Sequence, residues 1–146
     1  MDFGKLDPDF FARAGSYTPH IFRDVYPGID PKSEALSLKG KTVVITGATG
    51  GIGAGLITAF ALANVRAMVL LGRSEQKLAE RAGLVKQEYP SVQVFTVATD
   101  IVNKPDVDNA VSFIGTKLGK ADILVNNAGA LGSPSPVTES SIGAWW

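Results

Sequence analysis

Residues 46–53 read T-G-A-T-G-G-I-G, which is the most informative stretch of the sequence. A β-branched run over residues 41–45 precedes it, and an apolar helical pattern follows. Strand, glycine turn and helix in this order form the context in which a glycine cluster predicts phosphate binding. We expect Gly47 to allow the tight turn, Gly51 to let the backbone approach a pyrophosphate, and Gly53 to bring the helix close to the strand. The helix N-terminus would then offer unpaired N–H groups to the anion.

The spacing of the glycines is informative, because T-G-x-x-x-G-I-G departs from the general G-x-G-x-x-G of dinucleotide-binding folds. It resembles the signature of the short-chain dehydrogenase/reductase (SDR) family, in its short single-domain branch. A second block, D-I-L-V-N-N-A-G at residues 122–129, is similar to the family's strand-four motif, N-N-A-G. Asp100, which follows the apolar run 94–98, lies where members of the family contact adenine. The lead-in V-Y-P-G-I-D-P at residues 25–31 is similar to that of fungal members.

The composition is that of an ordinary globular protein without a long-range electric field. The chain has 146 residues, enough for one domain, with 14 basic and 14 acidic residues. A formal net charge of zero predicts no recruitment to nucleic acid or to an anionic membrane. With no cysteine, and with His20 as the single histidine, we expect no disulfide, no thiol nucleophile and no metal site. No secretory leader or membrane-spanning run is recognisable, so we expect a cytoplasmic protein.

From residue 41 the chain alternates between apolar runs and helical patterns, which predicts a doubly wound parallel α/β sheet of the Rossmann type. Right-handed crossovers give the strand order 3-2-1-4, with the first two helices on one face and the third on the other. The expected strands cover 41–46, 66–71, 92–98 and 122–126, and the expected helices cover 52–64, 74–88 and 104–118. The apolar faces of the first and third helices are expected to consist of Ile52, Leu56, Phe60 and Ala63, and of Val107, Val111, Ile114 and Leu118.

Residues 1–40 are expected to form an irregular N-terminal arm, in front of a nucleotide-binding Rossmann half-domain over residues 41–146. The arm holds four of the eight prolines and six of the twelve aromatic residues, and no helical or strand period persists in it. We expect one helical turn near residues 9–14. Exposed aromatic surface is unfavourable by about 25 cal/mol per Å², so the arm is expected to dock on its own domain or on a partner subunit. A substrate lid is the alternative.

The end of the second strand is expected to select the nucleotide. NAD-preferring members of the family carry an aspartate there, which accepts from the ribose 2′-hydroxyl and repels a 2′-phosphate. This chain has Gly72, then Arg73, which can pair with a phosphate, and Ser74 at the start of a helix. The resemblance therefore favours NADP over NAD. Against this, Gly50 stands where many NADP-binding relatives carry a basic residue, and Arg73 could be only an exposed charge leading the helix.

The resemblance implies one cofactor cleft at the carboxyl ends of the strands, where ligands bind in open parallel sheets. In the family, Asn126 and Thr46 would tie the strand-four turn to the glycine turn, and residues 127–129 would line the wall beside the nicotinamide ribose. Asp100 could equally be a turn or helix-capping residue, and the asparagines could simply close a turn. The expected cofactor-binding residues are Thr46, Gly47, Thr49, Gly50, Gly51, Ile52, Gly53, Arg73, Ser74, Asp100, Ile101, Asn127, Ala128 and Gly129.

The catalytic residues of the family are not recognisable in these 146 residues. In the family a tyrosine is the general acid and base for hydride transfer between the nicotinamide and a carbonyl or alcohol, and a lysine four residues later lowers its pKa. None of the three tyrosines has a lysine at that spacing, where Ile21, Asp30 and Gln93 stand instead. We therefore predict no catalytic residue. The resemblance implies the cofactor-binding half of an oxidoreductase, truncated before helix four.

Three functions remain open from the sequence. The chain could be part of a short-chain oxidoreductase that is inactive alone, a non-catalytic nucleotide-binding or regulatory module, or a truncated product without function. An epimerase of the extended branch is a weaker alternative, because its T-G-x-x-G-x-x-G spacing fits Gly47, Gly50 and Gly53 but the N-N-A-G block favours the short branch. The expected partner is a nicotinamide dinucleotide, and a small carbonyl or alcohol substrate would bind only in an intact enzyme. An uncovered fourth strand also predicts self-association through the sheet edge.

Overall fold

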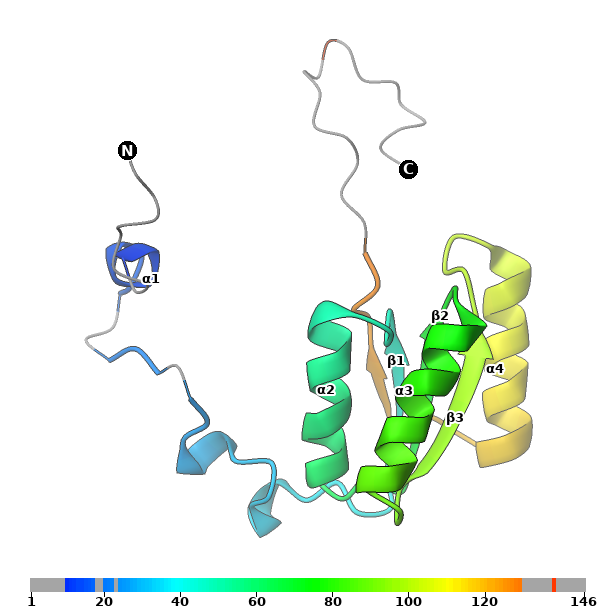
Figure 1. The fold of residues 1–146 in the computed structure, drawn as a ribbon, viewed down its shortest axis with the longest axis horizontal. Helices are drawn as coiled ribbons and strands as arrows, with labels where there is room; N and C mark the ends of the chain where they lie inside the picture. Colours follow the sequence, from blue (N-terminus) through cyan, green and yellow to red (C-terminus); the bar gives the residue numbers. More distant parts are fainter. Residues whose placement is uncertain (1–9, 18–19, 23, 130–137, 139–146) are drawn as a thin grey trace.

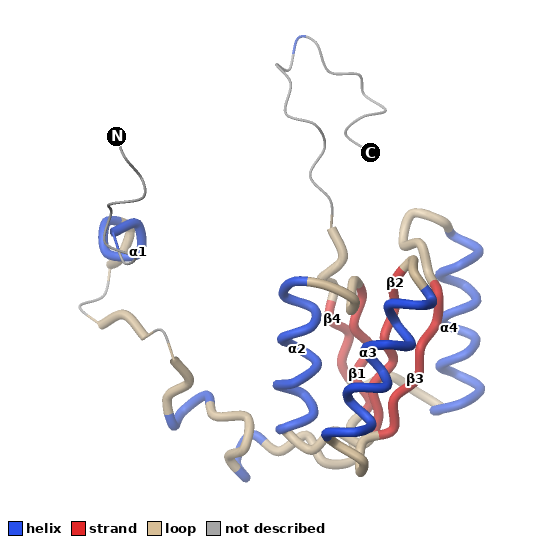
Figure 2. Tube along the Cα trace, viewed as in Figure 1, coloured by secondary structure: helices blue, strands red, loops and turns tan. Residues whose placement is uncertain are grey.

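Four parallel strands form the centre of the domain, in the spatial order β3-β2-β1-β4. The structure is a computed structural model, which describes residues 10–17, 20–22, 24–129 and 138. Helices α2 and α3 lie on one face of the sheet and α4 lies on the other (Figures 1 and 2). The strands are β1 (Thr42–Thr46), β2 (Ala67–Gly72), β3 (Gln93–Ala98) and β4 (Ile123–Val125), and the helices are α1 (Phe10–Ala14), α2 (Gly51–Leu62), α3 (Glu75–Glu88) and α4 (Lys104–Leu118). The predicted doubly wound fold is confirmed, and each strand and helix of the sheet domain agrees with its predicted range to within two residues.

The core lies on both faces of the sheet, because β1 and β2 are central and buried along their whole length. Alternate side chains of a strand point to opposite faces. On one face Ile45 packs with Ile57 of α2 and Leu78 of α3, and on the other Val69 packs with Ala110 of α4. Burial of each larger side chain contributes about 1.5–3 kcal/mol. This core fixes the sheet whose carboxyl edge carries the candidate site.

The predicted apolar face of α2 is wrong at its first position, since Ile52 is 77% exposed. The buried residues of the helix are Gly53, Ile57 and Ala61, spaced four residues apart. Gly53 faces the sheet because it packs against the carbonyl of Gly47. Neighbouring residues on a helix are rotated by about 100°, so this contact turns Ile52 toward solvent. Leu56 and Phe60 flank the buried row and pack against the core, as expected.

The predicted face of α4 is confirmed in part. Ile114 and Leu118 pack against the core and Val107 is half-buried, whereas Val111 is 63% exposed. The buried residue of α4 is Ala110, whose small side chain lets the helix approach the sheet. Val111 instead lines an apolar groove between α4 and β4.

β4 has only three residues, and the carboxylate of Asp122 holds its amino end. This carboxylate accepts a hydrogen bond of 2.9 Å from the backbone N–H of Thr42 at the start of β1. It also pairs with Lys120 at 3.1 Å and with Lys41 at 3.7 Å. The Thr42 N–H, and then Lys120, lower the pKa of Asp122 below its ordinary value. Asp122 therefore starts the strand, as predicted for it.

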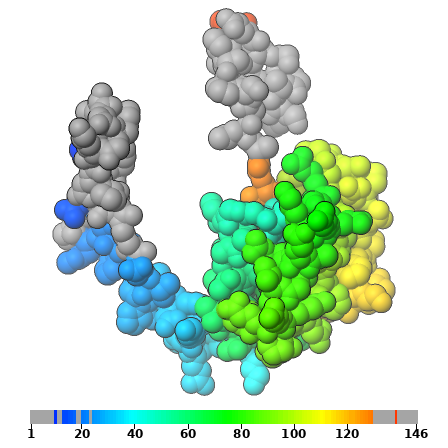
Figure 3. Space-filling view, in the orientation of Figure 1, coloured from blue at the N-terminus to red at the C-terminus, as the bar shows by residue number. Residues whose placement is uncertain are grey.

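The arm joins the domain at Leu38, which packs against the core and donates its N–H to the carbonyl of Ala63 at 2.7 Å. Helix α1 confirms the predicted helical turn. Figures 1 and 3 show the arm extending away from the domain on the side of α2. Tyr17, Phe22 and Val25 are 103%, 66% and 61% exposed, so these side chains are not docked on the domain. Docking on a partner subunit, the lid alternative and the arm boundary at residue 40 stay predictions.

Among the described residues, no helix combines the length and the apolar character needed to cross a membrane. The cytoplasmic location stays a prediction.

Candidate functional site

The glycine turn follows β1 directly. Gly47 has φ +64°, a left-handed conformation that strains any other residue, and a Cβ there would lie 2.9 Å from the Cα of Ala128. Gly51 has φ +50°, and a Cβ at that position would have no neighbour within 4 Å. The first glycine is therefore required by the turn and by its close approach to the loop after β4. The backbone at the second is open, and its contact with a pyrophosphate stays a prediction.

Helix α2 begins over this turn. A Cβ on Gly53 would collide with the carbonyl oxygen of Gly47 and would lie 2.9 Å from Nδ2 of Asn127. This glycine therefore lets the first turn of the helix lie directly on the strand-to-helix turn. Gly50 is the N-cap residue and provides no side-chain hydrogen bond. The N–H groups and the positive dipole end of α2 are thus available for an anion.

Thr46 ties the glycine turn to the loop that follows β4. Its Oγ1 accepts from the backbone N–H groups of Asn127 at 3.0 Å and Ala128 at 2.9 Å, and it donates to the carbonyl of Val125 at 3.2 Å. In return, Nδ2 of Asn127 donates to the carbonyls of Thr46 at 3.0 Å and Gly47 at 3.1 Å. The expected link between the glycine turn and the loop after β4 is present, but the prediction that Asn126 makes it is wrong. The structure gives that role to Asn127, because Asn126 lines the groove on the α4 side of the sheet.

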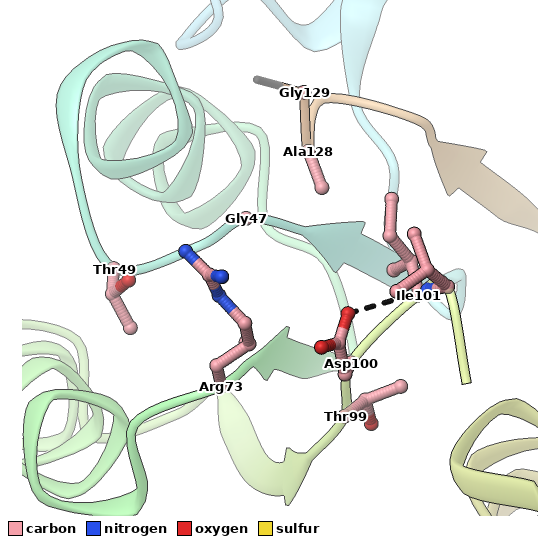
Figure 4. Close-up of a pocket in the computed structure, with 10 residues that line it drawn as sticks. Gly47, Thr49, Arg73, Thr99, Asp100, Ile101, Ala128 and Gly129 are labelled. Carbon is pink, nitrogen blue, oxygen red and sulfur yellow. Dashed lines mark hydrogen bonds between the residues drawn. The ribbon is translucent and has the colours of Figure 1, made fainter. Parts of the chain in front are cut away.

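A cleft of about 300 Å³ opens at the carboxyl ends of the four strands (Figure 4). Seven of the predicted cofactor-binding residues line it, namely Gly47, Thr49, Arg73, Asp100, Ile101, Ala128 and Gly129. The other seven do not line it, namely Thr46, Gly50, Gly51, Ile52, Gly53, Ser74 and Asn127. Most of these build the turn or the helix start behind the cleft, and Ser74 instead caps α3 by accepting from the N–H of Lys77 at 3.3 Å.

Three further residues line the cleft without having been predicted as site residues: Gly72, Thr99 and Val102. Gly72 ends β2, and a Cβ there would lie 3.4 Å from Cγ2 of Thr49. Thr99 follows β3, is buried, and donates its N–H to the carbonyl of Gly72 at 2.8 Å. Gly72 and Thr99 both stand at the carboxyl end of a predicted strand, so their positions in the sequence could have identified them as cleft residues. Val102 carries no comparable signal.

Arg73 provides a free positive charge at the cleft. Its side chain is exposed, and Figure 4 shows the guanidinium pointing into the space between Thr49 and Asp100. It forms no hydrogen bond or ion pair with any other residue that the structure describes. An unpaired guanidinium in such a cleft can bind a phosphate through two parallel N–H groups.

Asp100 is at once a turn residue and a cleft residue, so the two alternatives for it are compatible. Its Oδ1 accepts from the N–H of Val102 at 3.2 Å (dashed line in Figure 4), and its carbonyl accepts from the N–H of Asn103 at 3.0 Å. Its own N–H donates to Oδ2 of Asp106 at 3.0 Å. The second carboxylate oxygen accepts no hydrogen bond from the described residues and remains available to a ligand.

An apolar groove of about 590 Å³ adjoins the cleft on the α4 side of the sheet. Thr99, Ile101 and Ala128 line both the cleft and the groove. Leu124 of β4 and Val111 of α4 also line the groove and are 60% and 63% exposed. This face of the sheet is therefore only partly covered by α4.

The hydroxyl of Tyr89 is bonded to a neighbouring carboxylate and not to a cation. Tyr89 donates to Oε1 of Glu88 at 2.9 Å, and this carboxylate raises the pKa of the phenol. A tyrosine base at neutral pH needs the opposite shift. Among the described residues, no group of three or more histidine, cysteine, aspartate or glutamate side chains could hold a metal ion.

Comparison with known families matches residues 41–146 to the family described as short chain dehydrogenase. Among curated relatives, short chain dehydrogenase tazN from Aspergillus terreus is 32% identical over 149 residues, which cover 100% of this chain and 32% of the relative. Short chain dehydrogenase pigC from Monascus ruber is 31% identical over 146 residues, which cover 95% of this chain and 47% of the relative. Both are fungal proteins, which agrees with the resemblance of residues 25–31 to fungal members of the family.

Solved structures give the same result. L-sorbose reductase from Gluconobacter frateurii, complexed with NADPH and L-sorbose, is 36% identical with a TM-score of 0.70, over 75% of this chain and 41% of that one. The 2-keto-3-deoxy-D-gluconate dehydrogenase of Streptococcus agalactiae is 30% identical with a TM-score of 0.62, over 75% and 40%. The chain thus spans about a third to a half of the length of these relatives. With its glycine turn, its N-N-A-G block and its sheet order, this chain belongs to the short-chain dehydrogenase family.

Proposed function

We propose that this chain is the nicotinamide-dinucleotide-binding part of a short-chain oxidoreductase, which transfers hydride between the nicotinamide and a carbonyl or alcohol carbon. The observation that carries the proposal is the cleft at the strand ends, beside the glycine turn and the uncapped N-terminus of α2. A dinucleotide requires an anion site and an accessible glycine backbone for its pyrophosphate, and polar groups at the strand ends for its two nucleosides. The NADPH in the related L-sorbose reductase structure supports the same assignment.

The residues present fit such a cofactor. The N-terminus of α2 and the open backbone at Gly51 would hold the pyrophosphate, since a Cβ at Gly51 meets nothing within 4 Å. Asp100 and Ile101 would contact the adenine, and residues 127–129 would lie beside the nicotinamide ribose. The nicotinamide, when bound, supplies the hydride donor or acceptor. The residues of this chain bind and orient it.

NADP is the proposed cofactor rather than NAD. Gly72, at the end of β2, places no carboxylate against a 2′-phosphate. Arg73 carries an unpaired guanidinium directed into the cleft. A charge-assisted hydrogen bond of this kind contributes about 1.5–3 kcal/mol, which corresponds to a preference of about 10- to 100-fold.

Replacement of Arg73 tests the cofactor preference. Arg73→Ala is expected to weaken NADPH binding by about 10- to 100-fold and to leave NADH binding nearly unchanged, because only NADPH carries the phosphate. The ratio of the two dissociation constants, from calorimetric titration, is the measurement. Lys86→Ala, which removes an exposed positive charge at the other end of α3, is the matched control and should leave the ratio unchanged. An Arg73→Ala variant that still prefers NADPH as strongly as the wild type would contradict the role of Arg73.

A non-catalytic nucleotide-binding module is the second candidate. The observation that favours it is the sequence itself, in which no tyrosine has a lysine four residues later, together with the raised pKa of Tyr89. Under either candidate we propose that this chain binds cofactor without turnover. A product without function remains the alternative, and it would bind no nucleotide.

We also propose that the chain self-associates through the side of β4 that no described strand covers. Among the described strands, β4 pairs with β1 alone, and Leu124 and Val111 expose apolar surface beside it. Unpaired strand edges and apolar patches favour association. Sedimentation velocity should therefore show a concentration-dependent mass. A single boundary with the mass of the monomer at all concentrations would contradict this proposal.

A further inference from the structure

The carboxylate of Asp106 reaches out of α4 and holds the loop that borders the nucleotide cleft. Its Oδ2 accepts from the backbone N–H of Asp100 at 3.0 Å, across six residues, in a partly buried position. Asp106 lies in the first turn of α4, whose N-cap residue, Asn103, forms no side-chain capping bond. A carboxylate near a helix N-terminus ordinarily caps that helix. Here it extends past the N-cap to a residue that lines the cleft.

The loop that Asp106 holds is a closed turn. The Asp100 carbonyl accepts from Asn103 and its Oδ1 accepts from Val102, and these two hydrogen bonds shape the turn, while the second carboxylate oxygen stays open to a ligand. The backbone N–H of Asp100 donates to Oδ2 of Asp106. Without that carboxylate a partly buried N–H would lack its partner, which destabilises this one conformation of the turn. Asp100, Ile101 and Val102, three residues of the turn, all line the cleft.

We propose that Asp106 is a positioning residue for the adenosine half of the dinucleotide. It acts through another residue, because its Oδ2 is directed to the backbone N–H of Asp100. It fixes the backbone that carries Asp100 and Ile101 against the adenine, and it couples the start of α4 to the nucleotide site. This inference rests on the proposed function, because it assumes that the cleft binds a dinucleotide.

Binding of 2′,5′-ADP, the adenosine half of NADP, tests the proposal by calorimetry on the full chain. Asp106→Ala is expected to weaken 2′,5′-ADP and NADPH by about five- to tenfold, measured well below the Tm of the variant. Asp106→Asn keeps an acceptor oxygen and should restore most of the affinity. Asp108→Ala is the matched control, because Asp108 lies on the same helix turn and, among the described residues, pairs with Lys104 alone, at the exposed surface. It should bind both probes as the wild type does.

The outcomes separate the two claims. If Asp106→Ala lowers the Tm but leaves both dissociation constants unchanged, Asp106 only caps α4 and the inference is wrong. If the wild-type chain binds neither probe, the proposed function fails and the inference fails with it. Should Asp106→Ala not fold, amide exchange in the wild-type chain decides. Saturating 2′,5′-ADP should slow exchange at residues 100–103 at least tenfold, and unchanged exchange there would overturn the inference.

Discussion

Gly53→Ala is expected to destabilise the chain by about 2–3 kcal/mol and to abolish saturable nucleotide binding. The added Cβ would overlap the carbonyl oxygen of Gly47 and crowd Nδ2 of Asn127, and neither is the end of a flexible side chain free to move. The N-terminus of α2 would have to move off the glycine turn. The anion site and the hydrogen bonds from Asn127 would be lost together, so stability and binding should fall in the same variant.

Gly55→Ala is the matched control for this prediction. It lies two residues further along α2, and a Cβ there would meet nothing within 4 Å. Alanine is favoured over glycine in a helix by about 0.5–1 kcal/mol, so this variant should be as stable as the wild type or more so. Urea unfolding gives both free energies. Equal losses in the two variants would mean that the contact with Gly47 does not explain the effect, since a Cβ at Gly55 makes no such contact.

Thr46→Val is expected to lower the free energy of unfolding by about 2–4 kcal/mol. Valine has the shape of threonine but no hydroxyl, so the N–H groups of Asn127 and Ala128 both lose their acceptor in a partly buried site. Leaving a buried donor unpaired costs about 1–3 kcal/mol, and two donors are involved here. The loop after β4 should loosen, and with it the cleft wall formed by Ala128 and Gly129.

Thr46→Ser keeps the hydroxyl and should recover most of this loss, apart from the buried methyl group, which contributes about 1 kcal/mol. The measurement is the free energy of unfolding of both variants together with their affinity for NADPH. If Thr46→Ser is as unstable as Thr46→Val, packing of the methyl group and not the hydrogen bonds holds the two loops together.

Much of the fold could be predicted from the sequence because local and global signals agree. β2 is a continuous apolar run and proves to be buried on both faces. Ser74 precedes the helical pattern of α3 and caps it. Right-handed crossovers leave little choice of strand order once the elements are known. For the apolar strand and the helix cap, the residues that cause the structure lie within a few positions of each other, so a short stretch of sequence is enough to predict them.

The errors arise where a contact across the fold decides between adjacent residues. Asn126 and Asn127 are identical in type, and only the register of β4 on β1 gives the tie with Thr46 to Asn127. Ile52 belongs to an apolar pattern, but the contact of Gly53 with Gly47 turns it outward. The reach of Asp106 back to Asp100 is likewise a property of the folded loop.

These residues alone are expected to form a working dinucleotide cleft. Calorimetric titration of the purified wild-type chain with NADPH and, in parallel, with NADH tests it most directly. We expect saturable binding at a single site per chain, with NADPH the tighter ligand. A chain that melts cooperatively, and so is folded, but binds neither nucleotide would contradict it.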